Sequence, residues 1–308
     1  MGLLLQVGLL IIGFTMLVKG ADYFVDGAAG IATKFGIPQL VVGLTIVAMG
    51  TSAPEAAVSI TGALNGAADI SIGNVVGSNI LNILIILGIT GFITSVAVQK
   101  STLMIEMPFM LAITVLLIAL GMTGNKLTFV EGIIFWICFI AYLGYLYVLA
   151  KKGVEEEVTE DRPVWKLILF VLIGGIVVVL GANVSVNAAT AIAQAIGISE
   201  RFIGLTIVAL GTSLPELVAS VTAARKGNAD IAIGNIVGSN IFNILFVLGT
   251  SALITPVPYQ STFFIDGIIA VAAGVLLWVA TMKRKELTRP WAIVMLLGYV
   301  AYFIYLLV

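Results

Sequence analysis

The amino-acid sequence predicts an all-α membrane protein with ten transmembrane helices in two inverted five-helix repeats. Three observations support this fold class. Hydrophobic residues make up 60% of the 308 residues and charged residues only 10%, a balance typical of proteins that lie in lipid. Almost the whole chain divides into apolar stretches of about 20 residues, the length that spans a bilayer as a helix. Finally, two long sequence blocks of the first half recur in the second half.

Each apolar stretch is expected to be a helix, because in lipid only helices and closed barrels satisfy the backbone hydrogen bonds. The first stretch continues too long, and lacks a cleavage pattern, for a removable signal peptide. The ten expected helices are Leu3–Ile31, Leu40–Ala63, Ile70–Ile93, Thr102–Leu120, Leu127–Leu149, Val164–Ile196, Phe202–Ala224, Ile231–Leu253, Thr262–Met282 and Trp291 to the C-terminus.

An internal repeat is the strongest organisational signal in the chain. The block Gly43–Glu55 recurs as Gly204–Glu216 with only two of thirteen positions changed, and the block Ile72–Leu84 recurs as Ile233–Leu245. Both copies have the same offset, since 216 − 55 and 233 − 72 are each 161. The chain is therefore one duplicated unit.

The number of spans in each unit determines how the two copies are oriented. Five is an odd number, so the second copy enters the membrane from the opposite side, which is the plan of an inverted repeat. We expect a first repeat over residues 1–150, a cytoplasmic linker over 151–163 and a second repeat over 164–308.

Basic residues are distributed unevenly between the two ends of the expected helices. If both termini lie outside, only Lys126 and Arg201 fall at outer ends, with Lys19 left uncounted. This twelve-to-two bias predicts an integral protein of the cell membrane with both termini outside. The twelve residues at cytoplasmic ends are Lys34, Lys100, Lys151, Lys152, Arg162, Lys166, Arg225, Lys226, Lys283, Arg284, Lys285 and Arg289.

Two other features of composition limit the partners. The net charge of −1 suggests no polyanion, so we expect no nucleic acid, and no obligate protein partner is evident. The single cysteine, Cys138, excludes an intrachain disulfide.

The repeated blocks place a glutamate, Glu55 and Glu216, inside an apolar span of each half. A carboxylate at such a place costs about 2.5 to 3.5 kcal/mol even on lenient insertion scales. The nearest basic residues in sequence lie toward the membrane surface, which makes a bound cation the expected counter-charge. Two carboxylates would balance one divalent or two monovalent ions.

Oxygen-bearing groups surround both glutamates. Thr51 lies four residues before Glu55, on the same helix face, and Ser52 is adjacent. Pro54, with its copy Pro215, removes a backbone donor and frees carbonyls around residues 48–51 and 209–212. The second blocks add Ser78 and Asn82, and their copies Ser239 and Asn243. An all-oxygen site suits hard cations such as Ca²⁺ and Na⁺, and the chain contains no histidine.

These blocks resemble the two alpha repeats of the calcium:cation antiporter superfamily, and the sodium/calcium exchanger branch fits best. The resemblance implies Na⁺ coupling, because proton-coupled relatives typically have Asn in place of Thr51 and Thr212. It also implies no cofactor beyond the transported ions. The residues that it implies for the ion site are Ala48, Thr51, Ser52, Glu55, Ser78, Asn82, Ala209, Thr212, Ser213, Glu216, Ser239 and Asn243.

One departure concerns the second motif, which in many exchangers, including potassium-dependent ones, carries Asp in one half. This chain has Asn at both Asn82 and Asn243. Potassium co-transport is therefore not expected.

The sequence thus predicts a non-enzymatic antiporter that exchanges Ca²⁺ for Na⁺ by alternating access at a mid-membrane carboxylate site. A Ca²⁺/H⁺ antiporter is the nearest alternative, a cation channel a remote one, and an intramembrane hydrolase using Glu55 and Glu216 as an acid/base pair a third. The blander interpretation of the serines and asparagines is hydrogen bonding between helices. Glu106 and Asp266 are expected at the interface, while Asp22 and Asp26 could line a vestibule or face solvent.

Overall fold

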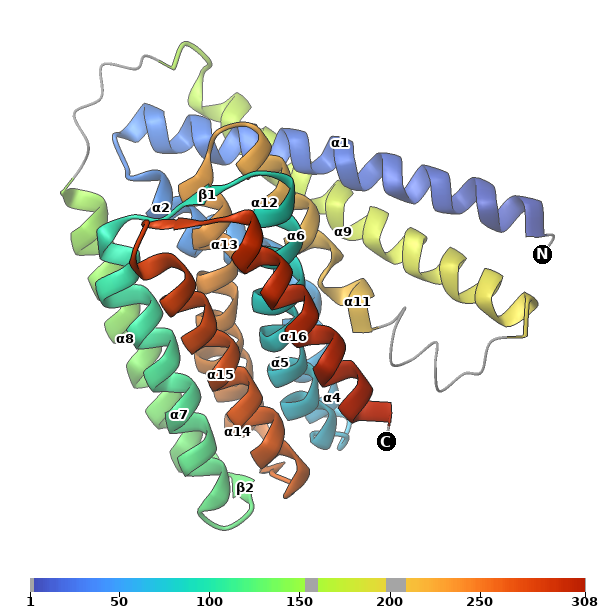
Figure 1. The fold of residues 1–308 in the computed structure, drawn as a ribbon, viewed down its shortest axis with the longest axis vertical. Coiled ribbons are helices and arrows are strands. Elements are labelled where there is room, and N and C mark those ends of the chain that lie inside the picture. Colours follow the sequence, from blue (N-terminus) through green and yellow to red (C-terminus); the bar gives the residue numbers. More distant parts are fainter. Residues whose placement is uncertain (1–2, 153–159, 198–208, 308) are drawn as a thin grey trace.

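The structure is a computed structural model that describes residues 3–152, 160–197 and 209–307 (Figure 1). This part of the chain is almost entirely helical, with short two-residue strands between helices and π-helical stretches labelled η. The elements of the first half are α1 (Leu3–Phe35), α2 (Gln39–Val42), η1 (Gly43–Val47), α3 (Ala48–Thr51), α4 (Ala53–Leu64), α5 (Asp69–Leu81), η2 (Asn82–Leu87), α6 (Gly88–Ile93), β1 (Val96–Ala97), η3 (Thr102–Glu106), α7 (Met107–Met122), β2 (Lys126–Leu127) and α8 (Phe129–Lys151). Those of the second half are α9 (Val164–Ala195), α11 (Ala209–Thr212), α12 (Leu214–Arg225), α13 (Ala229–Phe242), η5 (Asn243–Leu248), α14 (Gly249–Ile254), β3 (Val257–Pro258), α15 (Thr262–Met282), β4 (Glu286–Leu287) and α16 (Arg289–Leu307).

The described residues contain eight helices long and apolar enough to cross a membrane, or nine if a pair bent by 51° at Ser52 counts as one span. Several boundaries agree with the sequence to within a residue or two. The expected Thr262–Met282 is α15 itself, and the expected Val164–Ile196 is α9. The expected Phe202–Ala224 begins outside the described residues and continues through α11 and α12.

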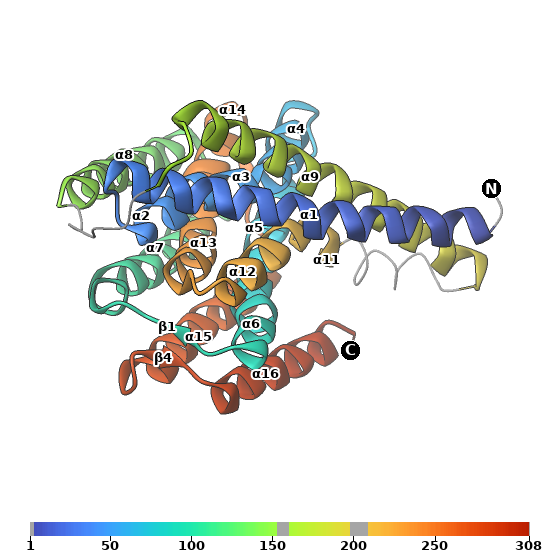
Figure 2. The same cartoon turned by 90° about the horizontal axis from the view of Figure 1, so that it is seen from above.

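The centre of the molecule is formed by the two spans that carry the second repeated block. The long helices differ in how much of an 18-residue apolar stretch is buried in each of them. The buried share is 94% in α13–α14 and 72% in α5–α6, whereas it is 39% at most in the other long helices. The helices α7, α8, α15 and α16 lie outside this core in both views (Figures 1 and 2). The helices that carry the second repeated block are therefore enclosed by the rest of the bundle.

The two longest helices, α1 and α9, run side by side across the bundle (Figures 1 and 2). They touch backbone to backbone, because a Cβ at Gly20 would lie 2.8 Å from the Val178 nitrogen and one at Gly174 would lie 2.5 Å from the Phe24 nitrogen. Small residues permit such close packing of membrane helices. The two helices form one closely packed pair.

Two short strand pairs join the halves of the chain. Strand β1 pairs with β4, matching Val96 with Leu287, and β2 pairs with β3, matching Leu127 with Val257. Val96 and Val257 occupy equivalent positions in the two copies of the repeat, as do Leu127 and Leu287 to within one residue. Each half therefore contributes two strands at equivalent positions, and each of these strands pairs with a strand of the other half.

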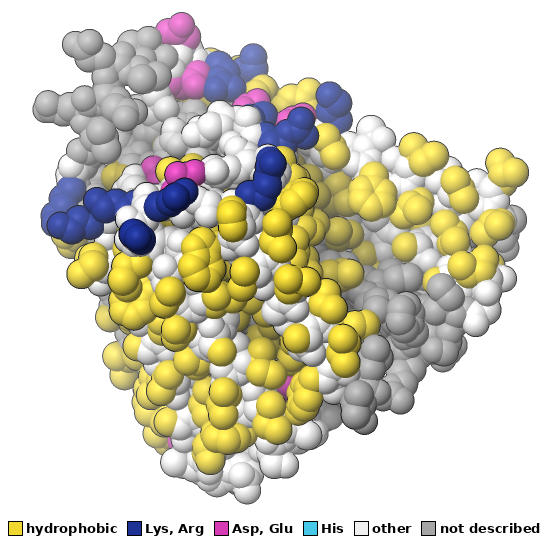
Figure 3. All heavy atoms as spheres, in the orientation of Figure 1, with side chains coloured by type: hydrophobic (Ala, Val, Ile, Leu, Met, Phe, Trp, Pro, Cys, Tyr) yellow, Lys and Arg dark blue, Asp and Glu magenta, His cyan; other side chains and the backbone are white. Residues whose placement is uncertain are grey.

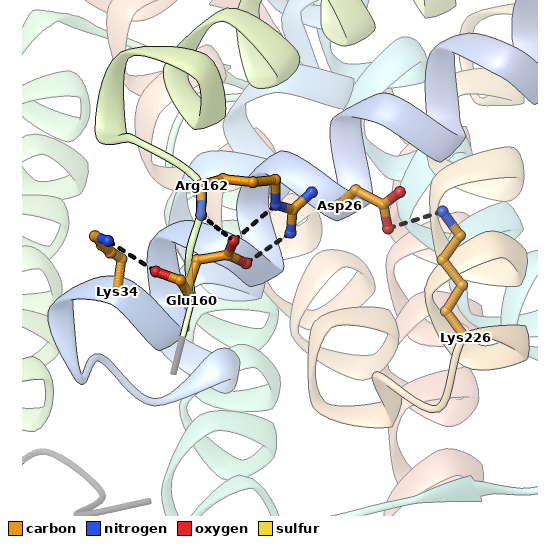
Figure 4. A network of polar contacts seen from close by, with 5 residues as sticks. All are labelled: Asp26, Lys34, Glu160, Arg162 and Lys226. Atoms are coloured by element: carbon orange, nitrogen blue, oxygen red, sulfur yellow. Dashed lines mark hydrogen bonds and ion pairs between the residues drawn. The ribbon is translucent and has the colours of Figure 1, made fainter. Parts of the chain in front are cut away.

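A polar network at one end of the molecule connects α1 to α12 and to the segment before α9 (Figure 4). The Lys226 ammonium lies 3.2 Å from Asp22 Oδ1 and 2.9 Å from Asp26 Oδ1, and it also donates to the Asp22 carbonyl at 3.1 Å. Arg162 forms a two-pronged contact with Glu160, whose carbonyl accepts from Lys34. The Arg162 hydrogen bonds lower the pKa of Glu160 to about 2.

The surface separates apolar from basic regions. In Figure 3 a broad apolar zone covers the lower part of the molecule, and the Lys and Arg side chains gather along its upper edge. Figure 1, in the same orientation, places β1 and β4 at that edge. This separation is the one that the positive-inside rule describes for membrane proteins.

Candidate ion-binding site

Both repeated glutamates lie in the first turn of a helix that begins at a break in the chain. Ser52 (φ −81°, ψ 8°) interrupts the path from α3 to α4, and Ser213 (φ −94°, ψ 5°) interrupts the path from α11 to α12. Pro54 falls in the first turn of α4, where a missing N–H costs no hydrogen bond. Glu55 and Glu216 thus lie near positive helix N-termini, which favour negative charge.

The two halves interlock at these carboxylates, which are completely buried, with exposed fractions of 1% for Glu55 and 0% for Glu216. The Ser52 hydroxyl donates to Glu216 Oε1 at 2.7 Å, and the Ser213 hydroxyl donates to Glu55 Oε1 at 3.3 Å. Each carboxylate is held by a serine of the other half. Glu55, Glu216, Ser52 and Ser213, which the sequence predicted as site residues, therefore form a single cluster.

Other expected site residues meet around the same cluster. The Thr51 hydroxyl contacts the Val47 carbonyl at 3.1 Å and Asn235 Oδ1 at 3.0 Å. The Ser239 hydroxyl donates to the Ala48 carbonyl at 3.4 Å, so this carbonyl faces the opposite half. The remaining expected residues are Ser78, buried in α5, and Ala209 and Thr212, which begin and end α11.

The asparagines form a second, fully buried cluster between the central helices. Asn82 Nδ2 donates to Asn240 Oδ1 at 3.0 Å, and Asn243 Nδ2 donates to Asn79 Oδ1 at 3.1 Å. Asn79 and Asn240 in turn donate to each other's backbone carbonyls at 3.1 and 3.2 Å. Sequence reasoning missed Asn79 and Asn240, although both follow the serine of the repeated Gly-Ser-Asn pattern.

A further asparagine in each half fixes the helix that carries the glutamate. Asn74 Nδ2 donates to the Glu55 carbonyl at 3.1 Å and to Ser59 Oγ at 2.9 Å. Asn235 does the same for the Glu216 carbonyl, at 3.3 Å, and for Ser220. These residues were also missed. Their signal was present in the repeat, since Asn74 and Asn235 are equivalent positions of the second block.

Four buried oxygens of the two clusters have no hydrogen-bond partner among the residues that the structure describes: Glu55 Oε2, Glu216 Oε2, Asn82 Oδ1 and Asn243 Oδ1. Among the described residues, no ion pair involves either glutamate. An unpaired polar group in an apolar interior is costly, and an unpaired charge more so. The arrangement offers oxygen acceptors and negative charge to a desolvated hard cation.

Both expected site asparagines lie at the start of a π-helical stretch. Asn82 begins η2 and Asn243 begins η5. Such widened turns occur frequently at functional sites. The local backbone thus departs from α-helical geometry at the same two positions that carry the unpartnered amide oxygens.

Comparison with known proteins agrees with this geometry. The family described as sodium/calcium exchanger protein matches residues 5–148 and 166–308. This chain belongs to the sodium/calcium exchanger family. The sodium/calcium exchanger MaX1 of Methanosarcina acetivorans is 34% identical over 345 aligned positions, covering 97% of each chain, and the inner membrane protein YrbG of Escherichia coli is 35% identical over 292 positions, covering 90% of each.

A solved structure shares the whole fold. The sodium-calcium exchanger NCX_Mj, soaked with zero Na⁺ and Ca²⁺, superimposes with a TM-score of 0.86 at 32% identity, covering 99% of this chain and 100% of that one. The protein is therefore an integral, multi-pass membrane protein of a cation antiporter family. The resemblance to the sodium/calcium exchanger branch is thereby confirmed as a family relationship.

A cavity of about 490 Å³ lies against one side of the exchanger's glutamate cluster. Its wall includes Pro54, next to Glu55, and Thr212, next to Ser213. Asn183 and Asn187 of α9 line it as well, so we call this side of the site the Asn183 side. The cavity wall therefore contains the chain neighbours of Glu55 and Ser213, while the carboxylates themselves stay buried behind it.

The repeat equivalents of Asn183 and Asn187 are Asp22 and Asp26, which bind Lys226, so we call their side of the site the Lys226 side. The positions there that correspond to the cavity wall are packed. The cavity wall contains Ala53 and Ala57, and the equivalent positions of the second repeat are Leu214 and Val218. These larger side chains pack against the apolar cluster formed by Leu17, Ala21, Val178 and Ala182 of α1 and α9. The two halves therefore differ in volume where the repeat would otherwise make them alike.

The other acidic residues that the sequence singled out lie outside the cluster. The expectation of interfacial solvation is wrong for Glu106, which is completely buried and accepts a hydrogen bond from the Tyr145 hydroxyl. Asp266 accepts from Tyr302 at 3.1 Å. Asp22 and Asp26 are partly exposed and form ion pairs with Lys226.

Proposed function

We propose that this exchanger is a secondary active antiporter that moves Ca²⁺ in one direction and Na⁺ in the other through one mid-membrane site. The observation that carries the proposal is the set of four buried, unpartnered oxygens, two of them on carboxylates with no basic partner among the described residues. One Ca²⁺ neutralises both glutamates, so a full set of Na⁺ cannot be held at the same time. Exchange of the two ions follows from this competition.

The proposed ligand set consists of two carboxylates and neutral oxygens. No group of three or more Asp, Glu, His or Cys residues occurs in the described part of the chain, so the neutral groups complete the coordination. Such a mixture of carboxylate, hydroxyl, amide and carbonyl oxygens is what Ca²⁺ accepts in proteins. The proposed ligands are Ala48, Thr51, Ser52, Glu55, Ser78, Asn82, Ala209, Thr212, Ser213, Glu216, Ser239 and Asn243.

The proposal includes an architecture of ten spans, in two inverted repeats over residues 1–150 and 164–308 joined by a cytoplasmic linker. The reciprocal strand pairs support it, as do the reciprocal bonds of Asn79 and Asn240, because each joins equivalent places of the two halves. An axis in the membrane plane relates inverted repeats of this kind.

Alternating access is proposed to move the α1–α9 pair across the core. The cavity on the Asn183 side and the packed cluster on the Lys226 side support this, because a single site then has one open and one closed approach. The basic edge in Figure 3 supports assignment of the Lys226 side to the cytoplasm, with both termini outside.

Flux in proteoliposomes tests the function. An outward Na⁺ gradient should drive ⁴⁵Ca²⁺ uptake, and Glu55→Gln should abolish it by removing one of two charges that balance the ion. Glu106→Gln is the matched control, since it changes a buried carboxylate outside the four-oxygen set and should preserve exchange.

Two results would contradict the proposal. Uptake driven by a pH gradient with no Na⁺ on either side would assign proton coupling. Unitary currents in planar bilayers would assign a channel.

A further inference from the structure

The direction of each hydrogen bond in the asparagine cluster is determined by a backbone carbonyl. A carbonyl oxygen can only accept a hydrogen bond, so the Asn79 side chain must turn its NH₂ group toward the Asn240 carbonyl, 3.1 Å away. Its own Oδ1 then has to face Asn243. Because Oδ1 also only accepts, Asn243 must present its NH₂ group to Asn79, at 3.1 Å.

The last amide in this series is left with one orientation. With its NH₂ group held by Asn79, Asn243 directs Oδ1 away, and this is one of the four buried oxygens without a partner. The same sequence of bonds runs from the Asn79 carbonyl through Asn240 to Asn82, whose Oδ1 is also unpartnered. Each half of the protein therefore orients the amide ligand of the other half.

We propose that Asn79 and Asn240 are positioning residues that decide which atom of Asn243 and Asn82 faces the transported ion; this inference rests on the proposed function. An amide can rotate to exchange its oxygen and nitrogen, and an NH₂ group directed at a cation replaces attraction by repulsion. Holding the oxygen in place before the ion arrives lowers the cost of binding. Asn79 and Asn240 need not touch the ion to act in this way.

Equilibrium Ca²⁺ binding, measured by calorimetry on the purified full-length protein, tests this role. Asn79→Ala should raise the Kd by about three- to tenfold, because Asn243 then has to be ordered by the ion itself. Thr114→Val is the control: it removes a buried hydroxyl in α7 that bonds only the Met110 carbonyl of its own helix, and the Kd should not change.

A second variant distinguishes orientation from simple support of the fold. In an Asn243→Asp background both side-chain atoms at position 243 are oxygens, so there is no orientation left to decide. Moreover, Asn79 Oδ1 would then face a carboxylate oxygen, an unfavourable contact of two acceptors. Asn79→Ala should therefore leave the Kd unchanged or lower it in that background. A merely structural role predicts weaker binding in both backgrounds.

The symmetric variants, Asn240→Ala alone and with Asn82→Asp, repeat the test and serve if the first pair does not fold. An unchanged Kd for the single alanine variants, or the same increase in the aspartate backgrounds, would overturn the positioning role while leaving the proposed function intact. A wild-type protein that binds no Ca²⁺ would instead refute the proposed function.

Discussion

Lys226→Gln should shift the exchanger toward opening on its Lys226 side. In the structure this ammonium joins the C-terminal end of α12 to Asp22 and Asp26 of α1, with contacts of 2.9 to 3.2 Å; the contact with Asp26 is drawn in Figure 4. The equivalent positions of the repeat are Asn65, Asn183 and Asn187, which carry no charge. The ion pairs thus stabilise closure on one side only, so removing them changes the balance between the two states.

The magnitude follows from the exposure of the three side chains, which is 29% for Lys226, 39% for Asp22 and 43% for Asp26. Partly exposed ion pairs contribute about 0.2 to 1 kcal/mol each, because water screens them. Two pairs on one ammonium therefore give about 1 kcal/mol, and the ratio of the two states should change about fivefold.

Cysteine accessibility in nanodiscs measures this ratio. In a Cys138→Ala background, Val218→Cys reports on the packed side and Ala57→Cys on the cavity side. Lys226→Gln should accelerate maleimide labelling at position 218 about fivefold and slow it at position 57. High salt should accelerate labelling at position 218 in the wild type as well, because it screens exposed charges.

The control and the refuting result come from the same helix end. Arg225→Gln removes the same charge one residue earlier, and Arg225 forms no ion pair within the described residues. If Lys226→Gln labels no faster than Arg225→Gln at position 218, or if the salt effect persists in Lys226→Gln, the ion pairs do not hold the closed state.

Three further outcomes follow from the site and the polar network. Ser52→Ala should weaken Ca²⁺ binding about tenfold, because it removes the 2.7 Å hydrogen bond that holds Glu216. A loss of this size is expected for a hydrogen bond to a charged group, and the Kd measured by calorimetry checks it. Ala57→Val, which copies the other half, should narrow the cavity and slow ⁴⁵Ca²⁺ entry from that side, and an unchanged rate would separate the cavity from the ion path. Arg162 lowers the pKa of Glu160 from 4.5 to about 2, so Glu160→Gln should reduce the melting temperature at pH 7. The difference in melting temperature should shrink as pH falls from about 4.5 to 2, and a pH-independent difference would exclude the Glu160 carboxylate as the source of the stabilisation.

The sequence alone determined where the long apolar helices lie and which oxygens are set apart from the apolar background. Lipid leaves backbone groups no partner but their own helix, so long apolar stretches are sufficient to locate helices such as Thr262–Met282. A carboxylate in such a stretch is costly enough that its presence is itself informative, and for this reason Glu55 and Glu216 were identified. The internal repeat then supplied an equivalent position in the second half for each of these residues.

Only the tertiary structure decided how the two halves meet. The bonds from Ser52 to Glu216 and from Asn243 to Asn79 each join residues 164 apart, and no local pattern specifies them because they depend on how α12 and α13 dock against α4 and α5. Burial of Glu106 is of the same kind, since its position near a span end suggested solvent while packing against α8 excludes it. Apolar periodicity encodes which faces are buried; the partner of each buried polar atom is settled when the helices pack.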